Sequence, residues 1–203
     1  MPAHLEVYVG PMFSAKTERL IAELKRATYA GKRIKVLKPG RDTRTDEFIA
    51  SRRVNPDGSV TIVDTFPAIV IRTEDELHAV LSPSDYDVLA IDEAQFFPLD
   101  EGMHDPLGWF GRAIRDLLRD KREGNLRILI AGLDLDFAEE PFGPMPGLLS
   151  LADTIEKLKA VCMACGDYNA HLSQRLSEVD SQIAVGDAGM YQARCRACFT
   201  APA

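Results

Sequence analysis

The sequence predicts an α/β fold with a mainly parallel sheet, followed by a small C-terminal zinc-binding domain. Stretches of buried-strand type alternate with helical patterns, and this alternation is typical of a parallel sheet covered by helices on both faces. A glycine-bearing turn follows the first strand, a later strand ends in two acids, and all four cysteines lie in the last quarter. We therefore expect two domains, at residues 1–158 and 159–203.

The composition is that of an ordinary globular protein. The 203 residues suit one domain with a small appendage, and 46% of them are hydrophobic, which is enough for a sizeable core. A net charge of −7 argues against a nucleic-acid backbone as the main partner. The chain has no apolar run long enough to cross a membrane and no secretory signal at its N-terminus. We therefore expect a soluble, cytoplasmic protein with neither nucleic-acid nor membrane partners.

The first strand, residues 5–9, leads into a turn that predicts phosphate binding. A strand, a glycine-bearing turn, Lys-Thr and then a helix at residues 18–29 form a loop whose backbone N–H groups and helix N-terminus attract phosphate. Lys16 is expected to reach the β- and γ-phosphates, and the Thr17 hydroxyl to bind Mg²⁺. The loop residues are Gly10, Pro11, Met12, Phe13, Ser14, Ala15, Lys16 and Thr17.

Ala15 departs from the usual phosphate-loop pattern, in which a second glycine occupies that position. If the position requires a positive φ, alanine is costly there; if the backbone is already near helical geometry, alanine is harmless. The alternative to a phosphate loop is an ordinary strand–turn–helix in which the Lys-Thr pair occurs by chance.

The remaining elements follow from hydrophobic patterns and turn residues. Thr73-Glu74-Asp75-Glu76 is a capping box that predicts a helix through Leu81. A polar turn and a charged loop are expected over residues 38–58, and the proline-rich segment 141–147 is expected to be neither helix nor strand. The other expected strands are 33–37, 60–63, 88–91 and 126–131, and the other expected helices are 106–119 and 148–159.

Two carboxylates follow the apolar strand at residues 88–91. In a parallel α/β sheet, groups at the carboxyl end of a strand face the ligand crevice. Asp92 is placed to hold Mg²⁺, and Glu93 could accept a proton from an attacking hydroxyl. The alternative is a strand capped by two solvated acids. With the phosphate loop, the order of elements predicts a RecA-like P-loop NTPase fold that uses ATP and Mg²⁺.

The cysteines form two pairs, each with Cys-x-x-Cys spacing. In a chain without an export signal, this spacing favours metal binding over disulfides. Four thiolates suit a tetrahedral structural Zn²⁺, and redox-active pairs are the alternative. The interval between the pairs is long, so a loop is expected to be inserted between them. The expected zinc ligands are Cys162, Cys165, Cys195 and Cys198.

Taken together, segments along nearly the whole chain resemble type II thymidine kinase, the cellular, non-herpes class of deoxynucleoside kinase. They occur in the order that the family has. The segments are Gly10-Pro11-Met12-Phe13-Ser14-Ala15-Lys16-Thr17, Lys38-Pro39 with Asp42-Thr43-Arg44, Ile91-Asp92-Glu93-Ala94-Gln95-Phe96-Phe97, Gly132-Leu133-Asp134 with Phe137, Pro141-Phe142-Gly143, and both cysteine pairs with Tyr191 between them.

The resemblance implies transfer of the γ-phosphoryl group of ATP to the 5′-hydroxyl of thymidine or deoxyuridine, a step of nucleotide salvage for DNA synthesis. Glu93 is implied as the general base, and Thr17 with Asp92 as the Mg²⁺ environment. Asp42, Arg44, Asp92 and Gln95 join the loop as ATP-binding residues. For Arg44 the alternative is a solvated loop arginine.

The resemblance also implies a nucleoside pocket closed by a lasso-like loop that the zinc ion anchors. Ser173 is where the family often has threonine near the thymine methyl group, and each aromatic residue could instead be core packing. The family is typically tetrameric and inhibited by thymidine triphosphate. The implied nucleoside-binding residues are Met12, Phe96, Phe137, Ser173, Gln182, Ile183, Ala184, Val185, Gly186 and Tyr191.

Two departures from the family pattern bear on substrate binding: Ala15 in the loop, and Asp187, an acid close to the nucleoside loop. Two other classes of protein fit parts of the sequence. A RecA-like helicase motor shares the acidic box, although it usually needs two such domains, and a zinc-ribbon binding module shares the cysteines. Release of ADP that depends on a nucleoside distinguishes a kinase from both.

Overall fold

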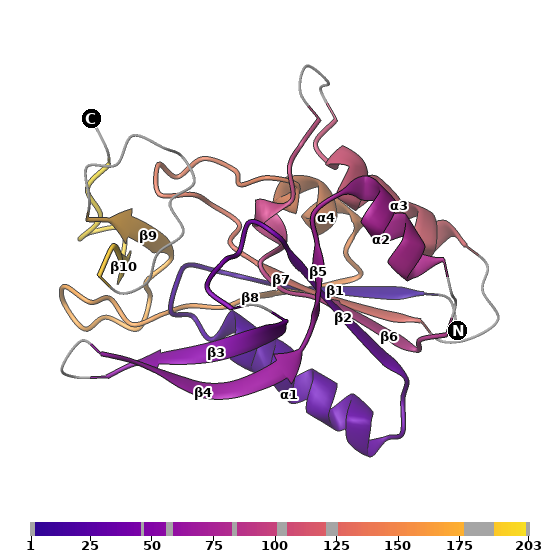
Figure 1. Cartoon of the computed structure of the whole chain (residues 1–203). Coiled ribbons are helices and arrows are strands. Elements are labelled where there is room, and N and C mark those ends of the chain that lie inside the picture. Colours follow the sequence, from indigo (N-terminus) through magenta and orange to yellow (C-terminus); the bar gives the residue numbers. More distant parts are fainter. Residues whose placement is uncertain are drawn as a thin grey trace.

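The computed structural model describes residues 3–45, 47–55, 59–82, 85–100, 105–120, 126–176 and 189–201. Its centre is a six-stranded sheet in the order β5-β2-β6-β7-β1-β8, in which every neighbouring pair is parallel (Figure 1). The predicted parallel α/β architecture is therefore confirmed. The strands of this sheet are β1 (His4–Val9), β2 (Ile34–Pro39), β5 (Ile69–Ile71), β6 (Val88–Ile91), β7 (Arg127–Gly132) and β8 (Thr154–Lys157).

Helices cover both faces of the sheet (Figure 1). One face carries α2 (Glu74–Leu81), α3 (Gly108–Arg119) and α4 (Met145–Leu151), and the other carries α1 (Lys16–Tyr29). Two antiparallel hairpins stand outside the sheet. The first, β3 (Phe48–Val54) with β4 (Val60–Pro67), packs on α1, and the second pairs β9 (Leu172–Arg175) with β10 (Tyr191–Arg194).

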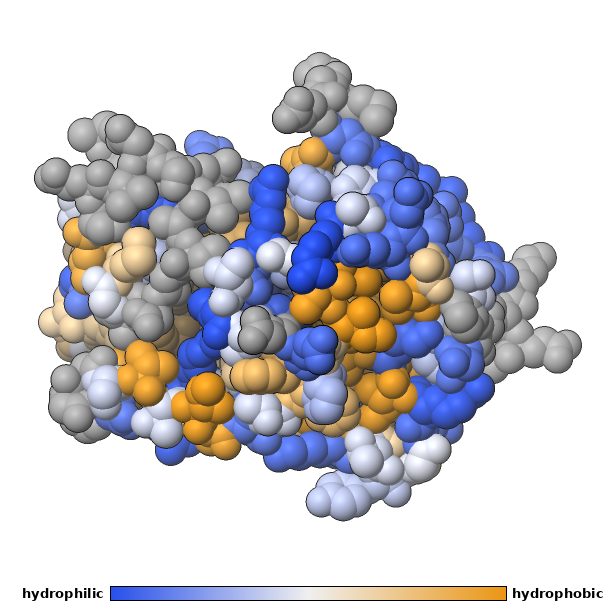
Figure 2. All heavy atoms as spheres, viewed as in Figure 1, coloured by the Kyte–Doolittle hydropathy of each residue, from blue (hydrophilic) through white to orange (hydrophobic). Residues whose placement is uncertain are grey.

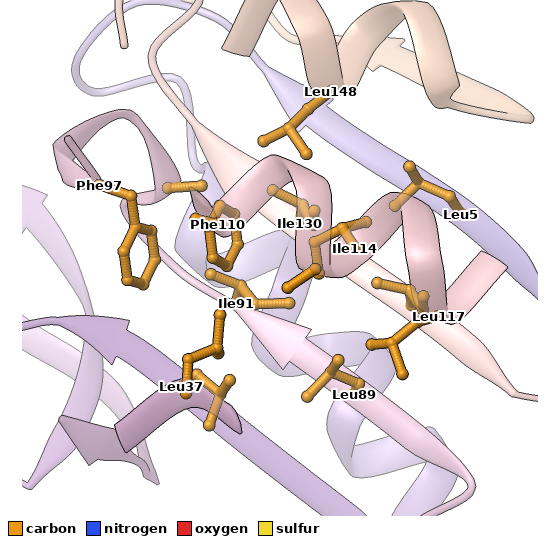
Figure 3. Close-up of a cluster of buried hydrophobic side chains, with 14 of the residues drawn as sticks. Leu5, Leu37, Leu89, Ile91, Phe97, Phe110, Ile114, Leu117, Ile130 and Leu148 are labelled. Carbon is orange, nitrogen blue, oxygen red and sulfur yellow. The ribbon is translucent and has the colours of Figure 1, made fainter. Parts of the chain in front are cut away.

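The central strands are buried on both faces, and their side chains alternate between two cores. In β6, Leu89 and Ile91 belong to the core under α2 and α3, whereas Val88 and Ala90 belong to the core under α1. The first core is drawn in Figure 3, where leucine and isoleucine side chains of the strands meet those of α3 and α4. Within it the Phe97 and Phe110 rings stack with their centroids 4.0 Å apart. Burial of these strands explains their continuous apolar sequences.

The two edge strands of the sheet are less well covered. In β5 the side chain of Ile69 is 43% exposed, and in β8 that of Ile155 is 51% exposed. On the face of the molecule drawn in Figure 2, hydrophilic and apolar residues are mixed. None of the helices in the described ranges is long and apolar enough to span a lipid bilayer.

The predicted start of α2 is confirmed, because the Thr73 hydroxyl accepts a hydrogen bond from the backbone N–H of Glu76. The capping box is only half formed, since the Glu76 carboxylate accepts from the backbone N–H of Arg72 and not from that of Thr73. Three other expectations are wrong. The charged loop predicted over 38–58 contains β3, and β2 itself extends to Pro39. The proline-rich segment contains the start of α4, where Pro146 lies in the first turn, in which a missing backbone N–H costs nothing.

The third wrong expectation is the helix over residues 148–159. Here α4 ends at Leu151, Ala152 is extended, and residues from Thr154 form β8. Asp153, between α4 and β8, holds the chain beside β1. Its backbone N–H donates to the carbonyl of Leu5, and its carboxylate accepts from the Leu5 N–H. Pairing with β1 therefore overrides the local helical preference.

A buried carboxylate ties α1 to the sheet below it. Glu23 is 1% exposed and accepts hydrogen bonds from three guanidinium groups, those of Arg19, Arg26 and Arg127. Arg127 also pairs with Glu6, which accepts from the Tyr8 hydroxyl. Burial opposes ionisation of Glu23, but the arginines prevail and lower its pKa from 4.5 to about 2.

We expect Glu23→Gln to lower the free energy of unfolding at pH 7 by about 3 kcal/mol, because each pKa unit corresponds to 1.36 kcal/mol. The folded-state pKa lies below the unfolded one, so the stabilisation is full above about pH 4.5 and is lost as pH falls towards 2. Urea unfolding at pH 7 and near pH 3 measures it. The exposed control Glu74→Gln should change stability by less than about 0.5 kcal/mol, and a Glu23 effect independent of pH would contradict the assignment.

Candidate active site

The phosphate loop connects β1 to α1 through two non-glycine residues with positive φ. Phe13 has φ of 64° and Ala15 has φ of 62°, and Ala15 is the N-cap of α1. At Gly10, φ is 145°, and a Cβ atom would lie 2.4 Å from the carbonyl oxygen of Leu158, so no larger residue fits. Of the two alternatives for Ala15, the costly one therefore holds, since its left-handed backbone favours glycine.

We expect Ala15→Gly to raise the free energy of unfolding by about 1 kcal/mol, because glycine adopts this conformation without the clash of a Cβ atom. Chemical denaturation measures the difference. The matched control is Ala22→Gly at an exposed position inside α1, where glycine should lower stability by about 1 kcal/mol. Two changes of the same sign would show that strain at Ala15 does not govern the effect.

Lys16 lies folded back against the loop. Its ammonium donates to the carbonyl oxygen of Pro11 at 2.6 Å and to Ser14 Oγ at 3.4 Å, and the Ser14 hydroxyl donates to the same carbonyl at 2.8 Å. Burial lowers the pKa of Lys16 to about 8, although Glu93 and Asp92 act in the opposite direction. The amine is thus close to the loop, and a phosphate at the helix N-terminus would offer it a stronger partner than a carbonyl.

Thr17 and Asp92 meet across the loop. The Thr17 hydroxyl donates to the two carboxylate oxygens of Asp92 at 3.0 and 3.2 Å. Asp92 follows β6 and is 5% exposed; burial and the neighbouring Glu93 raise its pKa to about 7. A hydroxyl and a carboxylate side by side are oxygen ligands of the kind that Mg²⁺ prefers, so this pair fits the expected cation.

Glu93 adopts a left-handed backbone conformation, with φ of 53° and ψ of 39°, immediately after β6. Strain of this kind in a non-glycine residue is concentrated at functional sites. Its carboxylate accepts from Arg44 and from the Gln95 amide, each at 2.5 Å. Gln95 is fixed in turn, because its side-chain oxygen accepts from the Leu133 N–H at 2.9 Å. Burial alone would raise the pKa of Glu93, but Arg44 holds it below its ordinary value.

Arg44 is not the solvated loop arginine of the alternative interpretation. Its side chain is 20% exposed and pairs with Asp42 at 2.7 Å as well as with Glu93. Asp42 also pairs with Lys38 at 3.0 Å, and Lys38 is fully buried with its amine on the Thr45 carbonyl and hydroxyl, both at 2.6 Å. A chain of alternating charges therefore runs from the interior of β2 to Glu93.

One pocket brings the phosphate loop, Glu93 and the expected nucleoside residues together. Ser173 in β9 touches the loop, because its Oγ accepts from the Met12 N–H at 3.0 Å. Phe96 packs edge to face on Phe142 in a small apolar cluster, and also lines the pocket. The expected nucleoside-binding residues that line this pocket are Met12, Phe96, Phe137, Ser173 and Tyr191. Residues 182–186 and Asp187 lie outside the described residues.

Sequence reasoning missed the contribution of the β3–β4 hairpin to this pocket. Ala50, Ser51 and Arg52 of β3 and Val60 of β4 all line it. The sequence of β3 was expected to be part of a charged loop and residues 60–63 were expected to form a short strand, and no motif marks any of these residues as functional. Leu133 and Phe142, which lie in family-matching segments, also line the pocket, and their apolar side chains after β7 were the available signal.

The four cysteines form a compact cluster. Their sulfur atoms lie within 4.8 Å of one another, and those of Cys165 and Cys195 are 3.7 Å apart. A tetrahedral zinc ion with bonds of about 2.3 Å holds its sulfur ligands about 3.8 Å apart, so the cluster fits zinc. Hydrogen bonds from the backbone, first from Cys195, lower the pKa of the Cys162 thiol to about 6, which favours the thiolate that a metal binds.

A parallel sheet with a phosphate loop after β1 and paired acids after β6 is the arrangement of a P-loop protein that binds nucleoside triphosphates. A family model described as thymidine kinase matches residues 3–199, so this chain belongs to the thymidine kinase family. Three curated relatives agree. The thymidine kinase of Bacteroides thetaiotaomicron is 38% identical to this chain over 96% of this chain and 86% of its own length. That of Mycoplasma genitalium is 37% identical over 94% of this chain and 80% of its own length. That of Porphyromonas gingivalis is 36% identical over 96% of this chain and 84% of its own length.

Proposed function

We propose that this chain is an ATP-dependent thymidine kinase that transfers the γ-phosphoryl group of ATP to the 5′-hydroxyl of thymidine, or of deoxyuridine, in nucleotide salvage. The observation that carries the proposal is that one pocket is lined by the phosphate loop, by Glu93 and by a set of aromatic residues. A planar base suits such a lining, and the reacting hydroxyl must lie near both a base and the terminal phosphate.

In this mechanism Glu93 accepts the proton of the 5′-hydroxyl as that oxygen attacks phosphorus. Arg44 keeps Glu93 ionised, and Gln95 fixes the orientation of its carboxylate. Lys16 leaves the Pro11 carbonyl for the phosphate oxygens, where loop N–H groups also donate, and together they stabilise charge on the transferring group. Thr17 and Asp92 would hold Mg²⁺, which neutralises charge on the β- and γ-phosphates.

We also propose that residues 159–203 form a zinc-binding domain that positions the nucleoside. Ser173 and Tyr191 of this segment line the pocket. One pair of the clustered cysteines precedes Ser173 in the sequence, and the other pair follows Tyr191. By family membership we further propose a cytoplasmic homotetramer that thymidine triphosphate inhibits. Gel filtration with light scattering tests the oligomer, and inhibition of ADP release by thymidine triphosphate tests the regulation.

Coupled ADP release with Mg·ATP tests the function. The acceptors to compare are thymidine, deoxyuridine, deoxycytidine, single-stranded DNA and none. Stimulation by thymidine, alone or with deoxyuridine, is expected. Stimulation by DNA alone would favour a motor, and no stimulation by any acceptor would mean that the chain has the family's fold without its activity.

A further inference from the structure

The hairpin wall of the pocket contains an irregularity that changes the course of the strand. In the pairing of β3 with β4, Ser51 lies opposite Asp64 but Arg52 lies opposite Ile62, so Val63 is an extra residue and forms a β-bulge. Successive residues of a regular strand point to opposite faces, yet Ala50, Ser51 and Arg52 all line the pocket. The extra residue belongs to β4, so the bulge bends that strand opposite Ser51 and Arg52.

Ser51 lines the pocket but does not present its hydroxyl to a ligand. The residue is 3% exposed, and its oxygen is enclosed by protein, without a hydrogen-bond partner among the residues that the structure describes. The next residue of this wall, Arg52, carries the polar group that matters for a ligand.

Arg52 offers a cation without an ion-pair partner among the described residues. Within the described ranges no carboxylate lies within ion-pair distance of its guanidinium, whose one hydrogen bond, at 3.4 Å, goes to the backbone carbonyl of Arg44. Arg44, by contrast, is matched by Asp42 and Glu93. Burial and the positive charge of Arg44 lower the pKa of Arg52, although Asp42, Glu93 and Asp92 act in the opposite direction.

Thymidine is neutral, so the ligand group that complements an unmatched guanidinium here is phosphate. We propose that Arg52 provides an anion subsite that binds terminal phosphate oxygens of the nucleotide, in addition to the phosphate loop. This inference rests on the proposed function for the identity of the nucleotide.

The test compares Arg52→Gln with Arg53→Gln, an exposed neighbour on the same strand that does not line the pocket. Calorimetric binding of inorganic tripolyphosphate is measured without nucleoside, together with the KM values for ATP and thymidine. Arg52→Gln should weaken tripolyphosphate binding and raise the KM for ATP by about ten- to hundredfold, since one charge-assisted contact is lost. The KM for thymidine should change less than about threefold, and Arg53→Gln should change neither ligand.

A further variant keeps the test decisive if Arg52→Gln folds poorly. Arg52→Lys keeps the charge but loses the planar fork, so intermediate affinity is expected.

Binding of tripolyphosphate does not depend on kinase activity, so the two proposals can fail separately. If wild-type protein releases no ADP with any nucleoside but Arg52→Gln still weakens tripolyphosphate binding, the subsite stands and the function fails. If wild-type protein is an active kinase and both Arg52→Gln and Arg52→Lys bind tripolyphosphate within twofold of wild type, the subsite is refuted.

Discussion

Glu93→Gln is expected to lower kcat for thymidine phosphorylation by about 10²- to 10⁴-fold while leaving ATP affinity within about threefold. Glutamine has the shape of glutamate but cannot accept the proton of the 5′-hydroxyl. ATP affinity should persist because Lys16 and Thr17 are untouched and Arg44 keeps its ion pair with Asp42. Single-turnover kinetics with saturating ATP and thymidine isolates the chemical step from product release.

The matched control for this prediction is Glu140→Gln. Glu140 is exposed, follows the same end of the sheet after β7 and does not line the pocket, so full activity is expected. A thermal melt of Glu93→Gln guards against loss of fold. Wild-type kcat in a folded Glu93→Gln protein would remove Glu93 from the role of general base.

Loss of the metal is expected to raise the dissociation constant for thymidine by about a hundredfold or more. Structural zinc contributes folding free energy directly, and Ser173 and Tyr191 lie on the hairpin that follows the first cysteine pair. Without the metal, Cys162 and Cys195 no longer hold the two ends of this segment together. Cys162→Ser and Cys195→Ser, or chelation of the wild type, should show the loss by equilibrium binding.

Ala164→Ser is the control, since Ala164 is exposed between the two cysteines of the first pair and provides no ligand atom. Elemental analysis should find about one zinc per chain in this control and in the wild type, and none in the cysteine variants. Normal thymidine affinity in a chain shown to lack the metal would contradict the positioning role.

The strands buried on both faces were predictable because burial leaves a continuous apolar run, as in β6. The strands β3 and β8 were not. Three of the four residues of β8 are exposed, so its sequence carries no apolar alternation, and β8 owes its extended state to pairing with β1. The polar sequence of β3 contains two adjacent arginines and a shift in register, which hides the period of two.

The residues of the candidate site were likewise only partly predictable from the sequence. Part of the site was predictable from short motifs, in which a few consecutive residues identify the loop or the strand end that carries them. These residues are Lys16, Thr17, Asp92 and Glu93. The burial of Lys38 depends on contacts made only after folding, as does the place of Arg52 in the pocket. The left-handed backbone of Ala15 could not be predicted either. The sequence allowed a positive φ, at which alanine is costly, or a near-helical backbone, at which it is harmless.

The hydrogen bond from Met12 to Ser173 links the two halves of the pocket thermodynamically. It joins a loop that we assign to the phosphate donor with a strand that we assign to the acceptor. A ligand that orders either element thereby reduces the entropy that the other ligand must overcome. Because such linkage is reciprocal, thymidine should increase the affinity for ATP by the same factor as ATP increases the affinity for thymidine. The two substrates are then expected to bind with synergy rather than independently.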